Sequence, residues 1–275
     1  MLWRLALAVA LSMSPLLAPG CLEASAFYHP AHRGNTAPAH ALDVRFPTTD
    51  GLTLHGWFFP ARGGASPAPT VLHVHGNSGD VSGHRFACDF LADRGFNVLL
   101  FDYRGFGASD PARGILRRKD LVEDTAAALD YLLTRQDVDP ERIAVFGYSL
   151  GAVLGLAAAE RPEIGAVVAY AGFSTWKGVA SDHAGPLGRA LIARGYDATE
   201  TVARLGDRPV LIVHGTADRV VPYRHAELIY AAAQRAGIRA ELMPVERGSH
   251  ISIGSDERVR GAVVAFLERE LGAGP

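Results

Sequence analysis

The chain has 275 residues, of which 48% are hydrophobic and 20% are charged, and its formal net charge at pH 7 is −2. This length and composition suit one globular domain whose core is large enough to fold without stabilising disulfides or metals. The near-neutral charge gives no electrostatic reason to expect nucleic acid as a partner. The two cysteines, Cys21 and Cys88, show no metal-ligand spacing.

The first twenty residues differ in composition from the rest. A single positive charge precedes an apolar run from Leu5 to Leu17, which predicts an export signal. Two prolines interrupt the run and argue against a long membrane-spanning helix. The run ends at Leu17-Ala18-Pro19-Gly20-Cys21, which resembles the lipobox of bacterial lipoproteins. The resemblance implies a bacterial, exported protein that is tethered to a membrane through lipidated Cys21. Simple cleavage and an uncleaved anchor are the alternatives.

Residues 22–40 are rich in Ala, His, Pro and Gly and are interpreted as a tether, so we expect the folded domain to occupy residues 41–275. Leu42–Phe46 and Leu52–Phe59 alternate apolar and polar residues, as half-buried strands do. Between them, Asp50-Gly51 is typical of a tight hairpin turn. The domain is therefore predicted to open with an antiparallel pair.

From Thr70 onward, short apolar runs alternate with helical patterns. The predicted strands are Val71–Val74, Val98–Phe101, Ile143–Phe146, Ala166–Tyr170, Val210–Val213 and Ala240–Pro244. The predicted helices are 81–94, 117–135, 150–160, 223–236 and 256–271. Buried strands joined by crossover helices indicate an α/β fold with a parallel sheet covered on both faces. Catalytic groups of such sheets lie at the carboxyl ends of the strands.

The segment 174–208 lacks this alternation and carries only two weak helical patterns, at 186–194 and 198–205. It is interpreted as a small lid over the active site. The alternative is an ordinary connecting helix with a long loop.

Residues 143–151 join an apolar run to the sequence Gly147-Tyr148-Ser149-Leu150-Gly151, and an Ala-rich helical segment follows. A strand, G-x-S-x-G and a helix form the context of a nucleophile elbow, a sharp turn that presents a serine at the sheet edge. Side chains two residues before and after the serine would collide in such a turn, which explains the glycines. We therefore expect Ser149 to be a nucleophile. The alternative is a chance match in a Gly-rich loop.

Further segments at the ends of predicted strands resemble motifs of the α/β-hydrolase superfamily. They are His75-Gly76-Asn77, Asp102-Tyr-Arg-Gly-Phe-Gly-Ala-Ser109 and His214-Gly-Thr-Ala-Asp218-Arg-Val-Val-Pro222. With the elbow and the short lid, they are similar to small-lid α/β-hydrolase-domain proteins of the serine-aminopeptidase-like kind. The resemblance extends from Leu42 to the C-terminus. It implies an eight-stranded, mostly parallel sheet whose second strand is antiparallel, and a serine hydrolase without a metal or organic cofactor.

A serine hydroxyl needs a histidine to take its proton, and the histidine needs an acid to orient it. In this superfamily the chain order is Ser, Asp, His. Asp218 lies just past a predicted strand, and His250 lies in the loop after the last one. Three other downstream histidines fit less well, because they lie in the predicted lid, within the acid motif or in the next helix: His183, His214 and His225.

The superfamily also implies an oxyanion hole, formed here by the backbone N–H groups of Asn77 and Leu150. A Gly-rich turn without this role is the alternative. Asp102 and Arg104 are interpreted as residues that fix their loop. Tyr103, Phe173, Trp176 and His183 are candidates for contact with the substrate.

Together these features predict hydrolysis of a carboxylic ester or related acyl bond through a Ser149–His250–Asp218 triad and an acyl-enzyme. A serine peptidase and a thioesterase or deacylase would use the same residues. A non-catalytic, tethered binding module is the alternative from another class. The substrate would be a small molecule or an acylated compound, and the sequence makes no prediction of oligomeric state.

Overall fold

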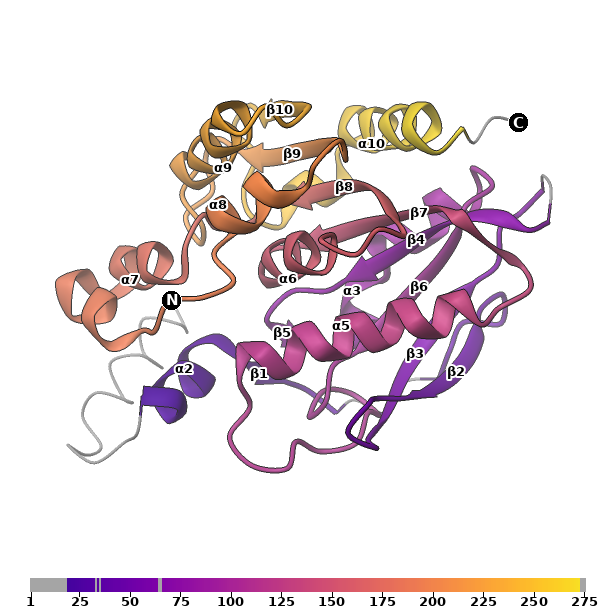
Figure 1. The fold of residues 1–275 in the computed structure, drawn as a ribbon, viewed down its shortest axis with the longest axis horizontal. Helices are drawn as coiled ribbons and strands as arrows, with labels where there is room; N and C mark the ends of the chain where they lie inside the picture. The colour runs from indigo at the N-terminus through magenta and orange to yellow at the C-terminus, as the bar shows by residue number, and fades with distance from the viewer. Residues whose placement is uncertain (1–18, 33, 35, 64–65, 273–275) are drawn as a thin grey trace.

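The computed structural model describes residues 19–32, 34, 36–63 and 66–272 (Figure 1). Its centre is an eight-stranded sheet with the strand order β10-β9-β8-β7-β4-β6-β3-β2. Within the described residues, β3 runs antiparallel to both neighbours, β2 and β6, and the other pairs are parallel. The predicted α/β-hydrolase fold, with its antiparallel second strand, is confirmed.

Every predicted strand is present. The sheet contains β2 (Leu42–Pro47), β3 (Thr53–Phe59), β4 (Ala68–Val74), β6 (Asn97–Asp102), β7 (Val138–Tyr148), β8 (Ile164–Tyr170), β9 (Val210–Gly215) and β10 (Ala240–Val245). A separate parallel pair joins β1 (His29–Pro30) to β5 (Ser78–Gly79). This small pair was not predicted.

The helices are α2 (Pro19–Phe27), α3 (Val81–His84), α4 (Cys88–Ala92), α5 (Arg118–Leu133), α6 (Leu150–Ala158), α7 (Trp176–Leu191), α8 (Ala198–Thr201), α9 (Arg224–Arg235) and α10 (Glu257–Leu271). Three 3₁₀ turns occupy Arg85–Ala87, Val202–Arg204 and Ser252–Ser255. The predicted helix 81–94 is therefore three short pieces, and the other helices of the parallel part lie where they were expected.

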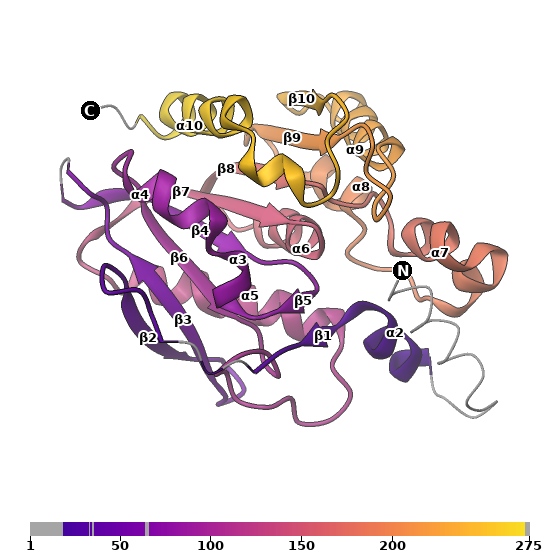
Figure 2. The ribbon, with the colours of Figure 1, turned by 180° about the vertical axis from the view of Figure 1, so that it is seen from behind.

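The sheet lies between two hydrophobic cores. Its central strands are therefore buried on both faces. Helices α5, α6 and α9 cover one face, and α3, α4 and α10 cover the other (Figures 1 and 2). Adjacent residues of β7 belong to different cores: Val145 lies in the same core as Leu154 of α6, and Phe146 lies in the same core as Phe266 of α10. This alternation along a strand places side chains in both layers.

The predicted tether is wrong for residues 22–30, which are part of the fold. Glu23 of α2 forms an ion pair with Arg118 at the start of α5, and both side chains are largely buried. The Phe27 ring lies 5.1 Å from the Trp176 ring of α7, in an edge-on contact. Pairing of β1 with β5 then fixes the chain beside the end of β4. These contacts join residues far apart in sequence, so local composition does not reveal them.

Most of the predicted export signal, residues 1–18, lies outside the described residues. Cys21 lies in the first turns of α2, and its side chain is partly exposed. Among the helices of the described chain, none combines the length and the hydropathy needed to cross a bilayer.

The first helix of the predicted lid begins about ten residues earlier than the expected 186–194. This helix, α7, starts at Trp176 and bends at Gly185, where φ is +60°, just before Pro186. A positive φ suits glycine, and proline cannot continue the hydrogen-bond ladder of a helix. The backbone N–H of Trp176 donates to Asp197 Oδ1 at 2.8 Å, which closes the segment on itself. Helix α7 lies beside α2, at one side of the sheet (Figures 1 and 2).

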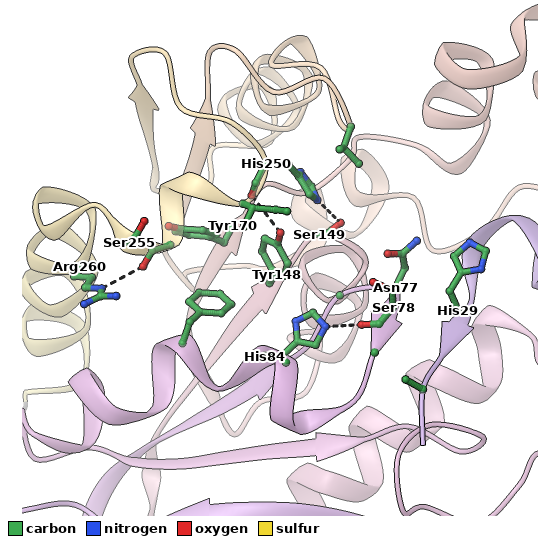
Figure 3. A pocket seen from close by; sticks show the side chains of 18 residues that line it. His29, Asn77, Ser78, His84, Tyr148, Ser149, Tyr170, His250, Ser255 and Arg260 are labelled. Atoms are coloured by element: carbon green, nitrogen blue, oxygen red, sulfur yellow. Dashed lines mark hydrogen bonds between the residues drawn. The ribbon is translucent and has the colours of Figure 1, made fainter. Parts of the chain in front are cut away.

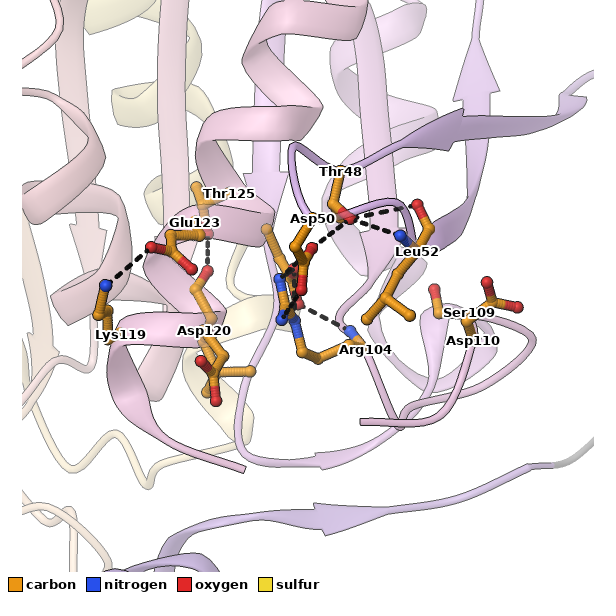
Figure 4. A network of polar contacts seen from close by, with 12 residues as sticks. Thr48, Asp50, Leu52, Arg104, Ser109, Asp110, Lys119, Asp120, Glu123 and Thr125 are labelled. Carbon is orange, nitrogen blue, oxygen red and sulfur yellow. Dashed lines mark hydrogen bonds and ion pairs between the residues drawn. The ribbon is translucent and has the colours of Figure 1, made fainter. Parts of the chain in front are cut away.

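The loop that follows β6 is fixed by buried charges (Figure 4). Arg104 Nε donates to Asp124 of α5 at 2.8 Å, and its Nη1 donates to Asp50 in the β2–β3 turn at 3.0 Å. Asp102 accepts hydrogen bonds from His55 Nδ1 at 3.0 Å and from the backbone N–H of Val81 at 2.8 Å. These contacts fit the loop-fixing role predicted for Asp102 and Arg104.

Candidate active site

Ser149 lies on a sharp turn between β7 and α6. Its backbone has φ +56° and ψ −116°, a combination that residues other than glycine rarely adopt. Its N–H donates to the carbonyl oxygen of Tyr170 at 2.8 Å, which holds the turn against the end of β8. A Cβ at Gly147 would overlap the Gly151 carbonyl, and a Cβ at Gly151 would overlap the Val74 carbonyl. Both glycines are therefore needed for the turn.

The three residues predicted as a triad lie together at the carboxyl ends of the strands. His250 Nε2 is 3.0 Å from Ser149 Oγ, and His250 Nδ1 is 2.7 Å from Asp218 Oδ2. Ser149 follows β7, Asp218 follows β9, and His250 follows β10. An ionised Asp218 accepts the Nδ1 proton, which leaves the Nε2 lone pair directed at the serine hydroxyl.

Asp218 is held in its ionised form by its hydrogen bonds. Its Oδ1 accepts the backbone N–H groups of Val220 and Val221 at 2.8 and 2.9 Å, and its side chain is fully buried. Burial raises the pKa of Asp218, but hydrogen bonds from His214 and His250 outweigh it, so the pKa lies well below its usual range. A permanently ionised acid of this kind stabilises an imidazolium that forms at His250.

The predicted oxyanion donors belong to the first residue of α6 and to the loop after β4. Leu150 is the first residue of α6, so its N–H has no acceptor within its own helix. Asn77 lines the same cavity as Ser149 and follows β4. Its carbonyl oxygen accepts the N–H of His29 at 2.8 Å, so the N-terminal strand β1 holds this loop in place.

Ser149, His250 and Asn77 line one cavity of about 840 Å³, a volume typical of small-molecule sites. Figure 3 shows Arg260 and Ser255 toward one end of this cavity and Asn77 and His29 toward the other, with Ser149 and His250 between them. No residue of the predicted lid, 174–208, lines it. The walls come instead from strand ends, from the 81–87 region and from the loop after His250.

The four predicted substrate-contact residues lie outside this cavity. Tyr103 is fully buried, and its hydroxyl donates to the carbonyl oxygen of His75 at 2.8 Å. Phe173 and Trp176 are buried against each other and Phe27. His183 Nε2 is 2.9 Å from the carbonyl oxygen of Val220, a residue of the cavity wall. The predicted contacts are therefore wrong as cavity-lining contacts. The rings of Tyr103, Phe173 and Trp176 pack in the core, and His183 contacts the backbone of Val220 instead.

Sequence analysis missed the residues that do form the walls. Three aromatic rings, of Phe86, Tyr148 and Tyr170, pack within 6.1 Å of one another beside Ser149. Exposed Ile251 and partly buried Arg260 extend the wall after His250. Tyr148 belongs to the predicted elbow and Tyr170 ends the next predicted strand, and these positions beside Ser149 were the available signal.

The histidines of β4 support the fold and remain neutral. Burial lowers the pKa of His73 to about 3, and the neighbouring His84 acts in the same direction. Burial also lowers the pKa of His75, whose Nδ1 is 2.7 Å from the carbonyl oxygen of Gly76. Within the described residues, no group of three or more His, Cys, Asp or Glu side chains is arranged to hold a metal ion.

A second Ser-His-Asp arrangement, which the sequence did not reveal, joins the segment after β8 to α7 and α9. Ser174 Oγ is 2.8 Å from His225 Nδ1, and His225 Nε2 is 2.7 Å from Asp182 Oδ2. Ser174 and His225 are each 1% exposed, and neither lines the cavity of Ser149. Ser174 also donates its backbone N–H to the same Nδ1 at 3.1 Å. We call these three residues the buried cluster.

Comparison with known proteins gives consistent matches. The model of the prolyl oligopeptidase family matches residues 83–274, which include all three triad candidates but not Asn77. The Salmonella typhi protein YfhR is 36% identical over 90% of this chain and 89% of its own length. The Pyrococcus furiosus esterase Pf2001 superposes with a TM-score of 0.74 at 21% identity, over 89% of this chain and 100% of that one. A Mycobacterium tuberculosis puromycin-hydrolyzing peptidase superposes with a TM-score of 0.73 at 26% identity, over 86% of this chain and 41% of that one.

The family match spans most of the chain, and the superpositions show the same fold in an esterase and a peptidase. The protein therefore belongs to the prolyl oligopeptidase family and is a serine hydrolase of the α/β-hydrolase superfamily.

Proposed function

We propose that the protein hydrolyses a carboxylic ester or related acyl bond, with Ser149 as nucleophile, His250 as general base and acid, and Asp218 as the orienting acid. The observation that carries this proposal is the continuous chain of contacts from Ser149 Oγ to His250 at 3.0 Å and on to Asp218 at 2.7 Å, at the wall of a cavity. A strained elbow and an ionised, buried acid support it.

In the first step, the Ser149 hydroxyl attacks the substrate carbonyl carbon while its proton passes to His250 Nε2. The carbonyl oxygen becomes an oxyanion, which the N–H groups of Asn77 and Leu150 stabilise. Loss of one such donor costs about 3–4 kcal/mol in comparable enzymes. His250 then gives its proton to the departing alkoxide, thiolate or amine, and the acyl group remains on Ser149.

In the second step, a water molecule loses a proton to His250 Nε2 and attacks the acyl carbon. The proton returns to Ser149 as the acid leaves. Asp218 stays ionised throughout and stabilises the imidazolium in both steps.

The test is turnover of 4-nitrophenyl acetate and labelling by a fluorophosphonate probe, in wild type, Ser149→Ala and Ser174→Ala. We expect Ser149→Ala to lose both activities by about 10⁴-fold or more while it remains folded. Ser174→Ala is the matched control, because it removes a serine hydroxyl from a similar arrangement outside the cavity, and should keep both. Full turnover in folded Ser149→Ala would overturn the assignment. Failure of the probe to label the wild type would favour a binding module.

Amide hydrolysis is a second candidate, favoured by the family match and by the likeness to the puromycin-hydrolyzing peptidase. A panel of esters, thioesters and aminoacyl amides, each measured against Ser149→Ala, separates the three bond types. A higher kcat/KM for aminoacyl amides than for simple esters identifies a peptidase. Selectivity for acyl-chain length with thioesters identifies a deacylase.

We also propose that the protein is exported and anchored to a membrane through lipidated Cys21. Because α2 packs against α5 and α7, an anchor at Cys21 would connect to the domain with almost no intervening chain. Mass spectrometry of protein from the membrane fraction tests this proposal. We expect a lipid-modified N-terminal Cys21, and a mature chain that retains residues 1–20 would contradict it.

A further inference from the structure

The cavity beside Ser149 has an unbalanced charge. Among its eighteen lining residues there is no aspartate or glutamate, and the single lysine or arginine is Arg260. A guanidinium group remains charged at any pH at which the protein is folded. The cavity therefore presents one permanent positive charge and no acid to a molecule that enters it.

Arg260 has no carboxylate partner of its own among the described residues. Its Nε donates to the carbonyl oxygen of Gly254 at 3.1 Å, and its guanidinium carbon lies 5.5 Å from the Phe90 ring centroid. Asp256, one helical turn earlier, is paired with Arg258 at 2.8 Å. The Nη groups of Arg260 make no hydrogen bond within the described chain, and the side chain is partly buried, where a charge is poorly compensated by water.

The route from Ser149 to Arg260 is apolar. The rings of Tyr148 and Tyr170 lie between them in Figure 3, with centroids 6.1 Å apart. The Phe86 ring packs against both, at 5.4 Å from Tyr148 and 6.1 Å from Tyr170. Burial raises the pKa of the Tyr170 hydroxyl, the positive charge of Arg260 opposes that rise, and the carboxylate of Asp256 adds to it, so both charged groups lie near this ring. An apolar spacer would fit against these rings, and an anionic group beyond it would meet Arg260.

We propose that the substrate carries a carboxylate, separated from the scissile carbonyl by an apolar segment, and that Arg260 binds this carboxylate. The inference rests on the proposed function of Ser149. A guanidinium group can donate two parallel hydrogen bonds to one carboxylate, and such charge-assisted bonds are about twice as strong as neutral ones. Arg260 is thus a specificity residue that does not touch the reacting bond.

The experiment compares esters that differ only in charge. Mono-4-nitrophenyl adipate and its methyl ester place the carboxylate on the acyl side. 3-(4-Acetoxyphenyl)propanoate and its methyl ester place it on the leaving-group side. We expect wild type to prefer the charged member of one pair by about tenfold or more in kcat/KM. The pair that shows this preference identifies the part of the substrate that lies against Arg260.

Variants then assign the preference to a residue. Arg260→Gln should bring the charged-to-neutral ratio close to one, Arg260→Lys should keep part of the preference, and Arg260→Glu should reverse it. Arg258→Gln is the matched control: it removes the same charge two residues away, from a side chain that is 79% exposed and outside the cavity. It should keep the wild-type ratio.

Two results overturn the proposal. The first is a wild-type ratio near or below one in both pairs, which is decisive even if a variant fails to fold. The second is an Arg260→Gln variant that turns over both esters of a pair equally more slowly, so that the charged-to-neutral ratio of kcat/KM stays at the wild-type value. This result would mean that Arg260 only holds the 251–255 loop through Gly254. Failure of the proposed function is distinguishable, because turnover would then persist in Ser149→Ala.

Discussion

Ser149 and Ser174 both lie within hydrogen-bond distance of a histidine that also contacts an aspartate. The distances are similar: 3.0 Å and 2.7 Å around His250, and 2.8 Å and 2.7 Å around His225. Residue types and distances alone would rank the two arrangements equally. Their surroundings separate them.

The first difference is the nitrogen that faces the serine. His250 turns Nε2 toward Ser149, with no other donor on that nitrogen among the described residues. His225 turns Nδ1 toward Ser174, and this nitrogen already accepts the Ser174 backbone N–H at 3.1 Å. Its lone pair is therefore engaged, and the ring proton must lie on Nε2, toward Asp182.

The second difference is access. Ser149 lines a cavity beside the N–H of the first residue of a helix, whereas Ser174 is 1% exposed and does not line that cavity. The buried cluster instead links the segment after β8 to α7 and α9 through hydrogen bonds. A reactive serine thus needs an unengaged base, an oxyanion site and room for a substrate, and proximity to His and Asp is insufficient.

Substitution of each histidine by asparagine should produce the largest difference between the two arrangements. His250→Asn should lower kcat/KM for 4-nitrophenyl acetate by about 10⁴-fold or more, because it removes the base. His225→Asn should change kcat/KM by less than about threefold but lower the free energy of unfolding by about 1–3 kcal/mol, because it disturbs buried hydrogen bonds. Kinetics and urea unfolding on both variants provide the measurement. A large catalytic loss in folded His225→Asn would contradict the assignment.

The aspartates should differ in the same way. Asp218→Asn should lower kcat by about 10⁴-fold, because an amide cannot hold the His250 tautomer or stabilise its charged form. Asp182→Asn, the matched change in the buried cluster, should leave kcat nearly unchanged and reduce stability. Equal catalytic losses in the two variants would show that the buried cluster acts in the reaction.

The pH dependence of stability sharpens the contrast for His225. Burial lowers the pKa of His225 despite the opposing effect of Asp182, so below about pH 6.5 the unfolded chain binds its proton more readily than the folded protein does. The free energy of unfolding therefore decreases as pH falls below that value, by at most about 1.4 kcal/mol per pH unit from this group. Urea unfolding between pH 7.5 and 5.5 should show a shallower decrease in His225→Asn. If the free energy of unfolding fell equally with pH in wild type and His225→Asn, the contribution of His225 would be refuted.

The smallest effect concerns the loop that carries His250. The Tyr148 hydroxyl donates to the His250 carbonyl oxygen at 3.2 Å. Tyr148→Phe removes one hydrogen bond, a change of about 0.5–1.5 kcal/mol, and should lower kcat/KM by less than about tenfold. Tyr131→Phe is the matched control, because Tyr131 lies on α5, outside the cavity, and its hydroxyl accepts a hydrogen bond from Arg135 just after that helix. A loss as large as that of His250→Asn would show that the hydroxyl itself takes part in the reaction.

The framework of the fold could be predicted because it depends on local patterns. Apolar runs and turn residues located the eight strands of the sheet, and Gly147 and Gly151 located the elbow. The order of strand ends then brought Ser149, Asp218 and His250 to one edge. A short segment of sequence is enough to indicate each of these features.

The substrate cavity could not be predicted, because long-range packing decides which aromatic rings are buried. Trp176 and Tyr103 were expected to contact the substrate but fill the core. Tyr148 of the elbow and Tyr170 of the next strand were given no role at the substrate but line the cavity. Likewise, the composition of residues 22–40 concealed the contact of Glu23 with Arg118, 95 residues away.

Helix α2 has a practical consequence for production of the protein. A recombinant chain that begins at residue 41, where composition places the domain boundary, would lack Glu23 and leave the largely buried Arg118 without its carboxylate. Loss of one partner of a buried ion pair typically costs about 3–5 kcal/mol. It would also uncover the Trp176 face that Phe27 covers and remove the β1 strand beside Asn77. A soluble, active version should therefore retain residue 22 onward, and a purification tag belongs at the C-terminus.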